Sequence, residues 1–150
     1  MPLTLAGKLE LASGFLKTQS TLALSTSGGA GSPLVAPLFY LPGDNLELYW
    51  FSSPRSAHSR NLKKDPAAAV AVYAHAETWE DIRGCQMLGD VAVITGQRRR
   101  AIAEAYVERF RLGALFRAAM VRSRLYAFRP RWARYIDNSR GFGFKFEIDL

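Results

Sequence analysis

The sequence predicts a mainly β protein of the α+β class, in which six antiparallel strands form a small barrel with helices at its flanks. Three observations favour this class. Short runs of alternating or apolar residues recur along the chain and are separated by turn-forming residues. The segment Pro42–Asn45 is a strong turn signal between two such runs, which is typical of an antiparallel hairpin. A chain of 150 residues, 49% of them hydrophobic, is long enough for one domain with its own core, residues 1–150.

Six segments carry the strand pattern, and the last of them predicts a long final strand. The fifth segment has room for one strand or two. Gly84 and Gly89 within it are expected at a bulge or at a close approach of a neighbouring backbone. The predicted strands are residues 20–26, 34–41, 46–52, 67–74, 81–95 and 124–137.

Helices are predicted before, between and after these strands. A first helix is indicated by one apolar face made of Leu5, Leu9, Ala12 and Leu16. A short second helix is expected from Ser56 to Lys64, and it ends at Asp65-Pro66 because the residue before proline resists helical backbone angles. A third helix is expected over residues 97–110, with an apolar face of Ala101, Ile102, Ala105, Tyr106 and Phe110. A fourth contains Leu112, Leu115, Phe116 and Met120.

The composition argues against a membrane span, a disulfide within the chain and a metal site. No apolar run approaches the roughly 20 residues of a membrane span, and no signal-peptide pattern is visible, so we expect no membrane partner. Cys85 is the only cysteine, which excludes a disulfide within the chain and favours a cytoplasmic location. His58 and His75 have no carboxylate at metal-ligand spacing, so we expect no metal site.

The segment Leu46–Pro66 has the pattern of an anion site. An apolar strand stops at Ser52 and Ser53, a turn follows, and Ser56 stands where a helix starts. Free backbone N–H groups and the positive end of the helix dipole attract anions at such a place, and hydroxyl groups add hydrogen bonds. Phosphate is the ligand that this arrangement favours.

These residues resemble the FMN-binding split-barrel superfamily, whose best-known members are the pyridoxamine 5′-phosphate oxidases. The IRGCQMLGD and YIDNSRGFGF blocks are similar to the small bacterial YhbP-type subgroup, whose function is not established. The resemblance implies a six-stranded antiparallel split β-barrel with flanking helices. It also implies a homodimer with FMN in grooves at the subunit interface. The matching pieces are PLVAPLFYL (Pro33–Leu41), LYWFSS (Leu48–Ser53), SAHSRNLKKDP (Ser56–Pro66), Ile82–Asp90 and Tyr135–Phe144.

The resemblance also assigns roles to residues of this chain. It implies that hydroxyl groups at the strand end and the helix start hold the flavin phosphate, with a histidine where a lysine is common. In the family, the backbone of the second strand runs beside the flavin ring. In this chain, Gln86 is expected to donate a hydrogen bond to a ring carbonyl, and Trp132 is expected to meet the flavin of the partner subunit. The residues expected at the phosphate are Ser52, Ser53, Ser56, His58 and Arg60. Phe51, at the strand end, is a candidate to flank the ring, and the other residues expected at the ring are Pro37, Leu38, Phe39, Gln86 and Trp132.

Each assignment has a simpler alternative that the residues leave open. Serines serve as turn residues and helix caps in any protein, and His58 and Arg60 can lie on a helix surface. Phe51 can belong to the core, Gln86 can face solvent, and Trp132 can fill a dimer interface without a cofactor. The sequence also departs from the family, because residues 36–41 lack the basic side chains with which the oxidases help to bind phosphate.

The sequence therefore favours an FMN-binding protein that acts as an oxidoreductase on an unidentified small molecule. It singles out no catalytic acid or base, and the basic residues with which the oxidases grip pyridoxal do not map onto this chain. One alternative is a haem-binding or non-enzymatic protein of the same fold, with His58 or His75 as the candidate axial ligand. Another is nucleic-acid binding by the basic stretch from Arg98 to Arg134, which holds eleven arginines and two acidic residues.

Overall fold

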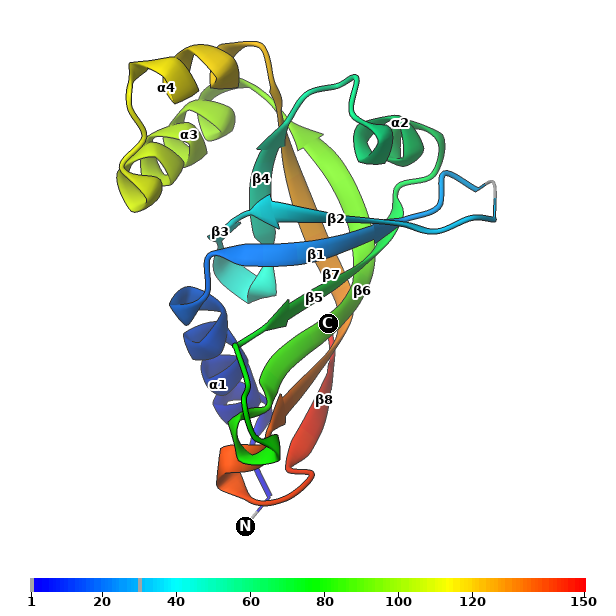
Figure 1. The fold of residues 1–150 in the computed structure, drawn as a ribbon, viewed down its shortest axis with the longest axis vertical. Helices are drawn as coiled ribbons and strands as arrows, with labels where there is room; N and C mark the ends of the chain where they lie inside the picture. Colours follow the sequence, from blue (N-terminus) through cyan, green and yellow to red (C-terminus); the bar gives the residue numbers. More distant parts are fainter. Residues whose placement is uncertain (1, 30) are drawn as a thin grey trace.

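One antiparallel sheet of eight strands organises the chain, and it curls into a half-barrel with four α-helices around it (Figure 1). The structure is a computed structural model that describes residues 2–29 and 31–150. The strand order is β2-β1-β5-β6-β7-β4-β3, and β8 pairs with β7. The helices are α1 (Leu5–Thr18), α2 (Ala57–Lys64), α3 (Gly96–Phe110) and α4 (Ala114–Val121). The strands are β1 (Thr21–Thr26), β2 (Leu34–Phe39), β3 (Leu41–Pro42), β4 (Leu48–Ser52), β5 (Ala67–Tyr73), β6 (Arg83–Ile94), β7 (Arg124–Asp137) and β8 (Lys145–Asp149).

The predicted α+β class and the split-barrel arrangement are confirmed, and the strand count is larger than six. The predicted strand 34–41 is divided at the buried Tyr40 into β2 and β3, and the hydroxyl of Tyr40 donates to the carbonyl of Leu16 in α1. β3 pairs with β4 whereas β2 pairs with β1, so this bend carries the chain from one edge of the sheet to the other. The eighth strand, β8, lies where no strand was predicted.

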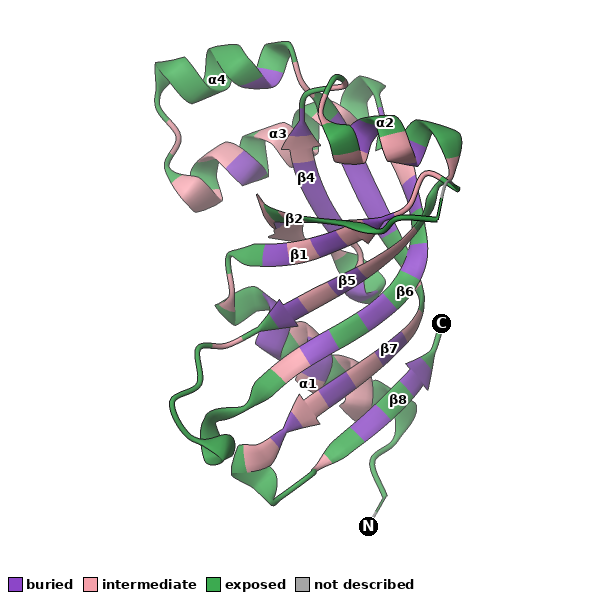
Figure 2. Cartoon of the chain, turned by 45° about the vertical axis from the view of Figure 1, so that its right-hand side comes forward, coloured by how far each residue is buried: buried purple, intermediate pink, exposed green. Residues whose placement is uncertain are grey.

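The core lies on the concave side of the sheet, where alternate residues of each strand point. Buried and exposed positions alternate along β1, β5 and β6 in Figure 2. Leu24 of β1 lies beside Val70 of β5 on the buried side, and Leu22 of β1 with Ala12 and Leu16 of α1 belongs to the same cluster. Burying these side chains supplies the main favourable term in folding. The predicted apolar face of the first helix is confirmed at Ala12 and Leu16, which are buried.

The long β6–β7 pair bends at a bulge. The register shifts between Leu88 and Gly89, and a Cβ atom on Gly89 would lie 2.2 Å from the carbonyl oxygen of Arg129. Gly84 is also tightly placed, because a Cβ atom there would lie 2.9 Å from the carbonyl oxygen of Val72. The expectation of close backbone approach at both glycines is confirmed, and the single strand β6 settles the question of one strand or two.

The helices after β6 pack less completely than their sequences suggest. In α3, Tyr106 is buried while Ala101 and Ala105 of the predicted apolar face are exposed. In α4, Met120 is buried, but Leu115 is 81% exposed and Phe116 is 59% exposed. The expected helix is present, but most of its apolar side chains lie on the surface.

No helix among residues 2–29 and 31–150 is both long enough and apolar enough to cross a bilayer.

Two glycine substitutions with opposite expected effects test this fold. Gly89→Ala forces a methyl group against the backbone of β7, and we expect a loss of roughly 1–3 kcal/mol in the free energy of unfolding. Gly14→Ala, in α1, meets no atom within 4 Å, and we expect a gain of about 0.5–1 kcal/mol because alanine favours a helix. Urea unfolding curves measure both. Equal stability of Gly89→Ala and the unchanged chain would contradict the placement of the bulge.

Candidate functional site

The best-defined polar site lies where β4 ends and α2 begins. β4 stops at Ser52, a turn follows, and Ser56 caps the helix by accepting a hydrogen bond from the N–H of Ser59 at 3.3 Å. Serine is among the best N-cap residues because its side-chain oxygen satisfies an N–H group that the helix leaves free. The sequence prediction of a helix that starts at Ser56 is therefore confirmed.

Hydroxyl groups and one imidazole form a connected cluster at this helix start. The Nε2 atom of His58 lies 2.8 Å from the Ser52 hydroxyl and 3.1 Å from the Ser56 hydroxyl. The Ser56 hydroxyl lies 2.7 Å from the Ser59 hydroxyl and 2.9 Å from the Ser53 carbonyl. We call Ser52, Ser53, Ser56, His58 and Ser59 the serine–histidine cluster. Ser52 and Ser59 are buried, so the cluster is fixed by packing as well as by hydrogen bonds.

Two backbone N–H groups remain available at the same place. The first four N–H groups of a helix have no partner inside the helix. The N–H of Ser59 bonds to the Ser56 hydroxyl and that of Arg60 bonds to the Ser56 carbonyl. Within the described residues, the N–H groups of Ala57 and His58 have no acceptor, so they are left to bind an anion.

His58 is a neutral partner of the hydroxyl groups in this arrangement. Burial lowers the pKa of His58 below its ordinary value of 6.5, because a partly desolvated imidazolium loses hydration. At neutral pH the ring therefore orients Ser52 and Ser56 and adds no full charge. A bound dianion would raise the pKa of His58 again, since an opposite charge favours the protonated form.

Arg55 and Arg60 supply the nearest permanent charges. Both are exposed, and a guanidinium nitrogen of Arg60 donates to the carbonyl of Arg55, so Arg60 folds back over the turn before α2. Lys63 and Lys64 lie in the last turn of α2. The site thus has cations at its rim and neutral donors at its centre.

Gln86 and Trp132 lie elsewhere, on the convex face of the sheet. They line a shallow hollow of about 400 Å³ across β1, β2, β5, β6 and β7, which we call the outer hollow. Gln86 pairs across the sheet with Ala71 and with Arg134, and the Arg134 guanidinium lies 5.1 Å from the centroid of the Trp132 ring. The hollow is lined by Ala23, Ser25, Val35, Ala69, Val70, Ala71, Gln86, Met87, Leu88 and Trp132.

The second-strand residues lie beside this hollow, on an edge of the sheet. β2 pairs with β1 alone, and Pro37 and Phe39 are exposed while Leu38 is half-buried. Phe39 is 53% exposed, although the centroid of its ring lies 4.9 Å from the ring centroid of Phe110 in α3. The backbone of β2 is therefore accessible from its unpaired edge.

The structure does not bring all the predicted residues together. Ser52, Ser53, Ser56 and His58 meet, and Arg60 lies at their rim. Gln86 and Trp132 meet in the outer hollow. Phe51 belongs to neither group. Its ring packs against α3, where the ring centroids of Phe51 and Tyr106 are 5.2 Å apart. In one protomer the expected phosphate residues and ring residues form separate groups.

Two features were not singled out from the sequence. Ser59 belongs to the cluster, and its position three residues after the cap is the signal that would have found it. The small residues of the outer hollow, such as Ala69 and Ala71, become a site only once the strand register is known. Cys85 is buried in the core, and burial raises the pKa of its thiol to about 12.

The comparison with known families agrees with the fold. The family profile described as pyridoxamine 5′-phosphate oxidase matches residues 10–138. The chain belongs to this family. Within it, the UPF0306 protein YhbP of Salmonella paratyphi C is 29% identical over 111 residues, which cover 73% of this chain and 72% of that protein.

Two solved structures with a similar fold belong to proteins that are described as binding different ligands. A haem-binding protein from Mycobacterium smegmatis has a TM-score of 0.78 at 18% identity, over 99% of this chain and 59% of that one. An FAD-binding protein from Mesorhizobium loti has a TM-score of 0.61 at 18% identity, over 82% of this chain and 89% of that one. At these identities the likeness shows the fold alone.

The lowered pKa of His58 predicts a pH dependence of stability. Because the folded state binds fewer protons than the unfolded chain below pH 6.5, the free energy of unfolding falls as the pH drops through the folded pKa of His58. Thermal unfolding between about pH 7 and about pH 5.5 measures this loss, in a window above the ordinary carboxyl pKa values. His58→Gln should flatten the slope. His75→Gln, which changes an exposed histidine outside the cluster, should keep it. The same slope in His58→Gln as in the unchanged chain would contradict the assignment.

Proposed function

We propose that this protein binds FMN at the interface of a homodimer and acts as a flavin-dependent oxidoreductase on a small molecule. The observation that carries the proposal is the serine–histidine cluster with the free N–H groups of Ala57 and His58, in a chain of the pyridoxamine 5′-phosphate oxidase family. The single buried cysteine, Cys85, favours the cytoplasm as the place of action.

The donor set of the cluster fits a phosphate group. Phosphate oxygens accept hydrogen bonds, and the cluster offers hydroxyl groups, two backbone N–H groups and a ring nitrogen within a few ångströms of one another. The N-terminus of α2 adds the positive end of its dipole. Arg55 and Arg60 are placed to neutralise charge at the rim, a role that the second strand cannot fill because residues 36–41 carry no basic side chain.

A homodimer accounts for the separation of the phosphate and ring residues. Around the outer hollow, the convex face of the sheet bears exposed apolar side chains, including Val35 at 65% and Leu88 at 47% exposure, and Figure 2 shows none of the described helices over this part of the face. Exposed apolar surface of this kind is typical of an interface. The proposal requires that a second copy packed there brings its own Gln86 and Trp132 to the serine–histidine cluster of the first.

FMN and the protein have different roles in the proposed site. FMN, when bound, would supply the hydride chemistry, because flavins accept and donate hydride. The serine–histidine cluster holds the phosphate, Gln86 is a hydrogen-bond donor for the ring, and Trp132 covers it and excludes water. No side chain is assigned as a catalytic acid or base.

Haem is the second candidate ligand, supported by the likeness to the haem-binding protein of Mycobacterium smegmatis. His58 is half-buried and bonded to two hydroxyl groups, whereas His75 is almost fully exposed, 3.6 Å from Glu77. Titration with haemin, followed by absorbance in His58→Ala and His75→Ala, tests this candidate.

Nucleic-acid binding has less support, because six of the eleven arginines between residues 98 and 134 bond to acidic side chains, a tyrosine or carbonyl groups of the chain.

Removing the cluster tests the phosphate assignment. The double substitution Ser56→Ala with His58→Ala removes a hydroxyl and the ring that orients it, so we expect FMN affinity to fall by at least about tenfold, or roughly 1.4 kcal/mol. Quenching of flavin fluorescence measures the affinity, and circular dichroism verifies that the variant is folded. His75→Ala is the control and should bind as the unchanged chain does. Unchanged affinity in the double variant would remove the phosphate assignment.

Complementation between two defective protomers tests the shared site. One partner carries Ser56→Ala and His58→Ala, and the other carries Gln86→Ala and Trp132→Ala. About half of the dimers formed on co-expression are mixed, and each mixed dimer contains one intact site, so about a quarter of the FMN sites should return. Each variant expressed alone is the control and should bind weakly. No recovery in the mixture would place the site within one protomer and overturn the dimer proposal.

A further inference from the structure

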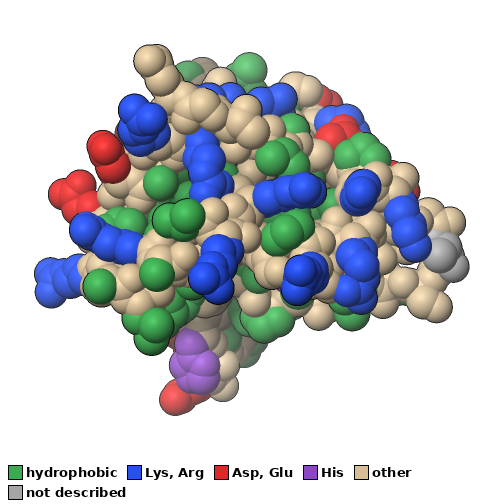
Figure 3. Space-filling model, turned by 90° about the horizontal axis from the view of Figure 1, so that it is seen from above, with side chains coloured by type: hydrophobic (Ala, Val, Ile, Leu, Met, Phe, Trp, Pro, Cys, Tyr) green, Lys and Arg blue, Asp and Glu red, His purple; other side chains and the backbone are tan. Residues whose placement is uncertain are grey.

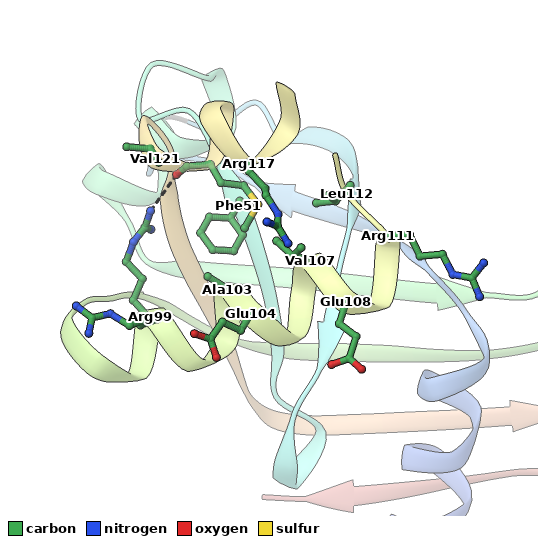
Figure 4. Close-up of a pocket in the computed structure, with 12 residues that line it drawn as sticks. Phe51, Arg99, Ala103, Glu104, Val107, Glu108, Arg111, Leu112, Arg117 and Val121 are labelled. Atoms are coloured by element: carbon green, nitrogen blue, oxygen red, sulfur yellow. Dashed lines mark hydrogen bonds between the residues drawn. The ribbon is translucent and has the colours of Figure 1, made fainter. Parts of the chain in front are cut away.

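A large hollow of the described chain lies between α3 and α4, away from the serine–histidine cluster. Its volume is about 680 Å³, within the roughly 300–1,000 Å³ of ligand pockets. Its lining is mainly apolar, with Phe51 of β4 as the floor (Figure 4). We call this hollow the α3–α4 cleft. Its apolar lining consists of Phe51, Ala103, Val107, Leu112, Met120 and Val121.

Arginines surround this apolar lining. Five of the eleven arginines between residues 98 and 134 have no side-chain hydrogen bond or ion pair to any described residue. Three of these five, Arg100, Arg111 and Arg117, line the α3–α4 cleft. Viewed from the end that holds α2, α3 and α4, the surface shows many lysine and arginine side chains among hydrophobic ones (Figure 3). The unpaired positive charge of this region is thus concentrated around one apolar hollow.

The side chain of Arg117 points into the cleft. In Figure 4, Arg117 of α4 extends over the apolar lining and ends beside Phe51 and Val107, whereas Arg111 points away. Arg99 is held in place, because its guanidinium donates to the carbonyl of Met120 at 2.9 Å and lies 5.1 Å from the centroid of the Phe51 ring.

The acidic residues of the lining do not neutralise this cation. The carboxylates of Glu104 and Glu108 point away from Phe51 in Figure 4, and neither forms an ion pair within the part of the chain that the structure describes. Four arginines and two glutamates leave the lining with a net positive charge. An apolar cavity with an inward guanidinium that has no partner within the described residues is complementary to a molecule with an apolar body and an anionic end.

We propose that the α3–α4 cleft binds a small amphipathic carboxylate, whose apolar body lies on Phe51 and Val107 and whose carboxylate pairs with Arg117. The guanidinium fork matches a carboxylate in a bidentate arrangement. The site is separate from the serine–histidine cluster, since the Phe51 ring and the Ser52 hydroxyl leave opposite faces of β4.

Titration with octanoate, measured by calorimetry, tests the proposal, and 1-octanol is the matched probe without charge. We expect octanoate to bind one site per chain and octanol to bind at least about tenfold more weakly, because only the carboxylate pairs with Arg117. Arg117→Gln should remove this preference. Arg122→Gln changes the arginine that directly follows α4 and does not line the cleft, and it should leave octanoate binding within about twofold.

A second variant separates the cleft from the flavin site. Ala103→Trp places a large side chain in the cleft without removing a charge, and it should abolish octanoate binding while FMN affinity stays unchanged. No octanoate binding to the unchanged chain, equal binding of octanoate and octanol, or displacement of octanoate by FMN would each overturn the proposal. Dissociation of a dimer by octanoate would also overturn it, because the cleft would then be covered by a second copy of the chain.

Discussion

The β6–β7 ladder is the contact on which the rest of the structure depends. It pairs all twelve residues of β6, and β7 also pairs with β4 and β8, so it joins the strands on both sides of the bend. The bulge at Leu88 and Gly89 bends this ladder and divides the convex face into two regions. In the half nearer α3, Leu125 and Ala127 are covered by the helix and buried, whereas Trp132 in the other half remains accessible.

This division positions both halves of the proposed flavin site. β4 pairs with the covered half of β7 and delivers Ser52 to the start of α2, where the hydroxyl groups and His58 gather. The uncovered half presents Gln86 and Trp132, and none of the described helices lies over them. Asn61 of α2 donates to the Thr26 hydroxyl at the end of β1, which fixes α2 to the sheet. The serine–histidine cluster and an uncovered apolar part of the convex face thus both follow from one curled sheet.

Local chemistry made some features predictable from the sequence, and long-range pairing made others unpredictable. Ser56 and Gly89 were identifiable because a helix cap and a bulge depend on nearby residues. β8 was missed because its five residues give too short an alternation to outweigh the glycines before it. Periodicity showed that Leu115 and Phe116 lie on a helix but not whether anything covers them, and both are exposed. The outer hollow depends on the register of five strands, which no local pattern encodes.

A titration that compares FMN with riboflavin tests the central claim most directly. The two ligands share the ring and differ in the phosphate, so their difference in affinity isolates the contribution of the serine–histidine cluster. The account predicts saturable FMN binding, with riboflavin at least about tenfold weaker, because the charge-assisted hydrogen bonds to phosphate are lost. Equal affinity for the two ligands, or no FMN binding at high micromolar concentration, would contradict it.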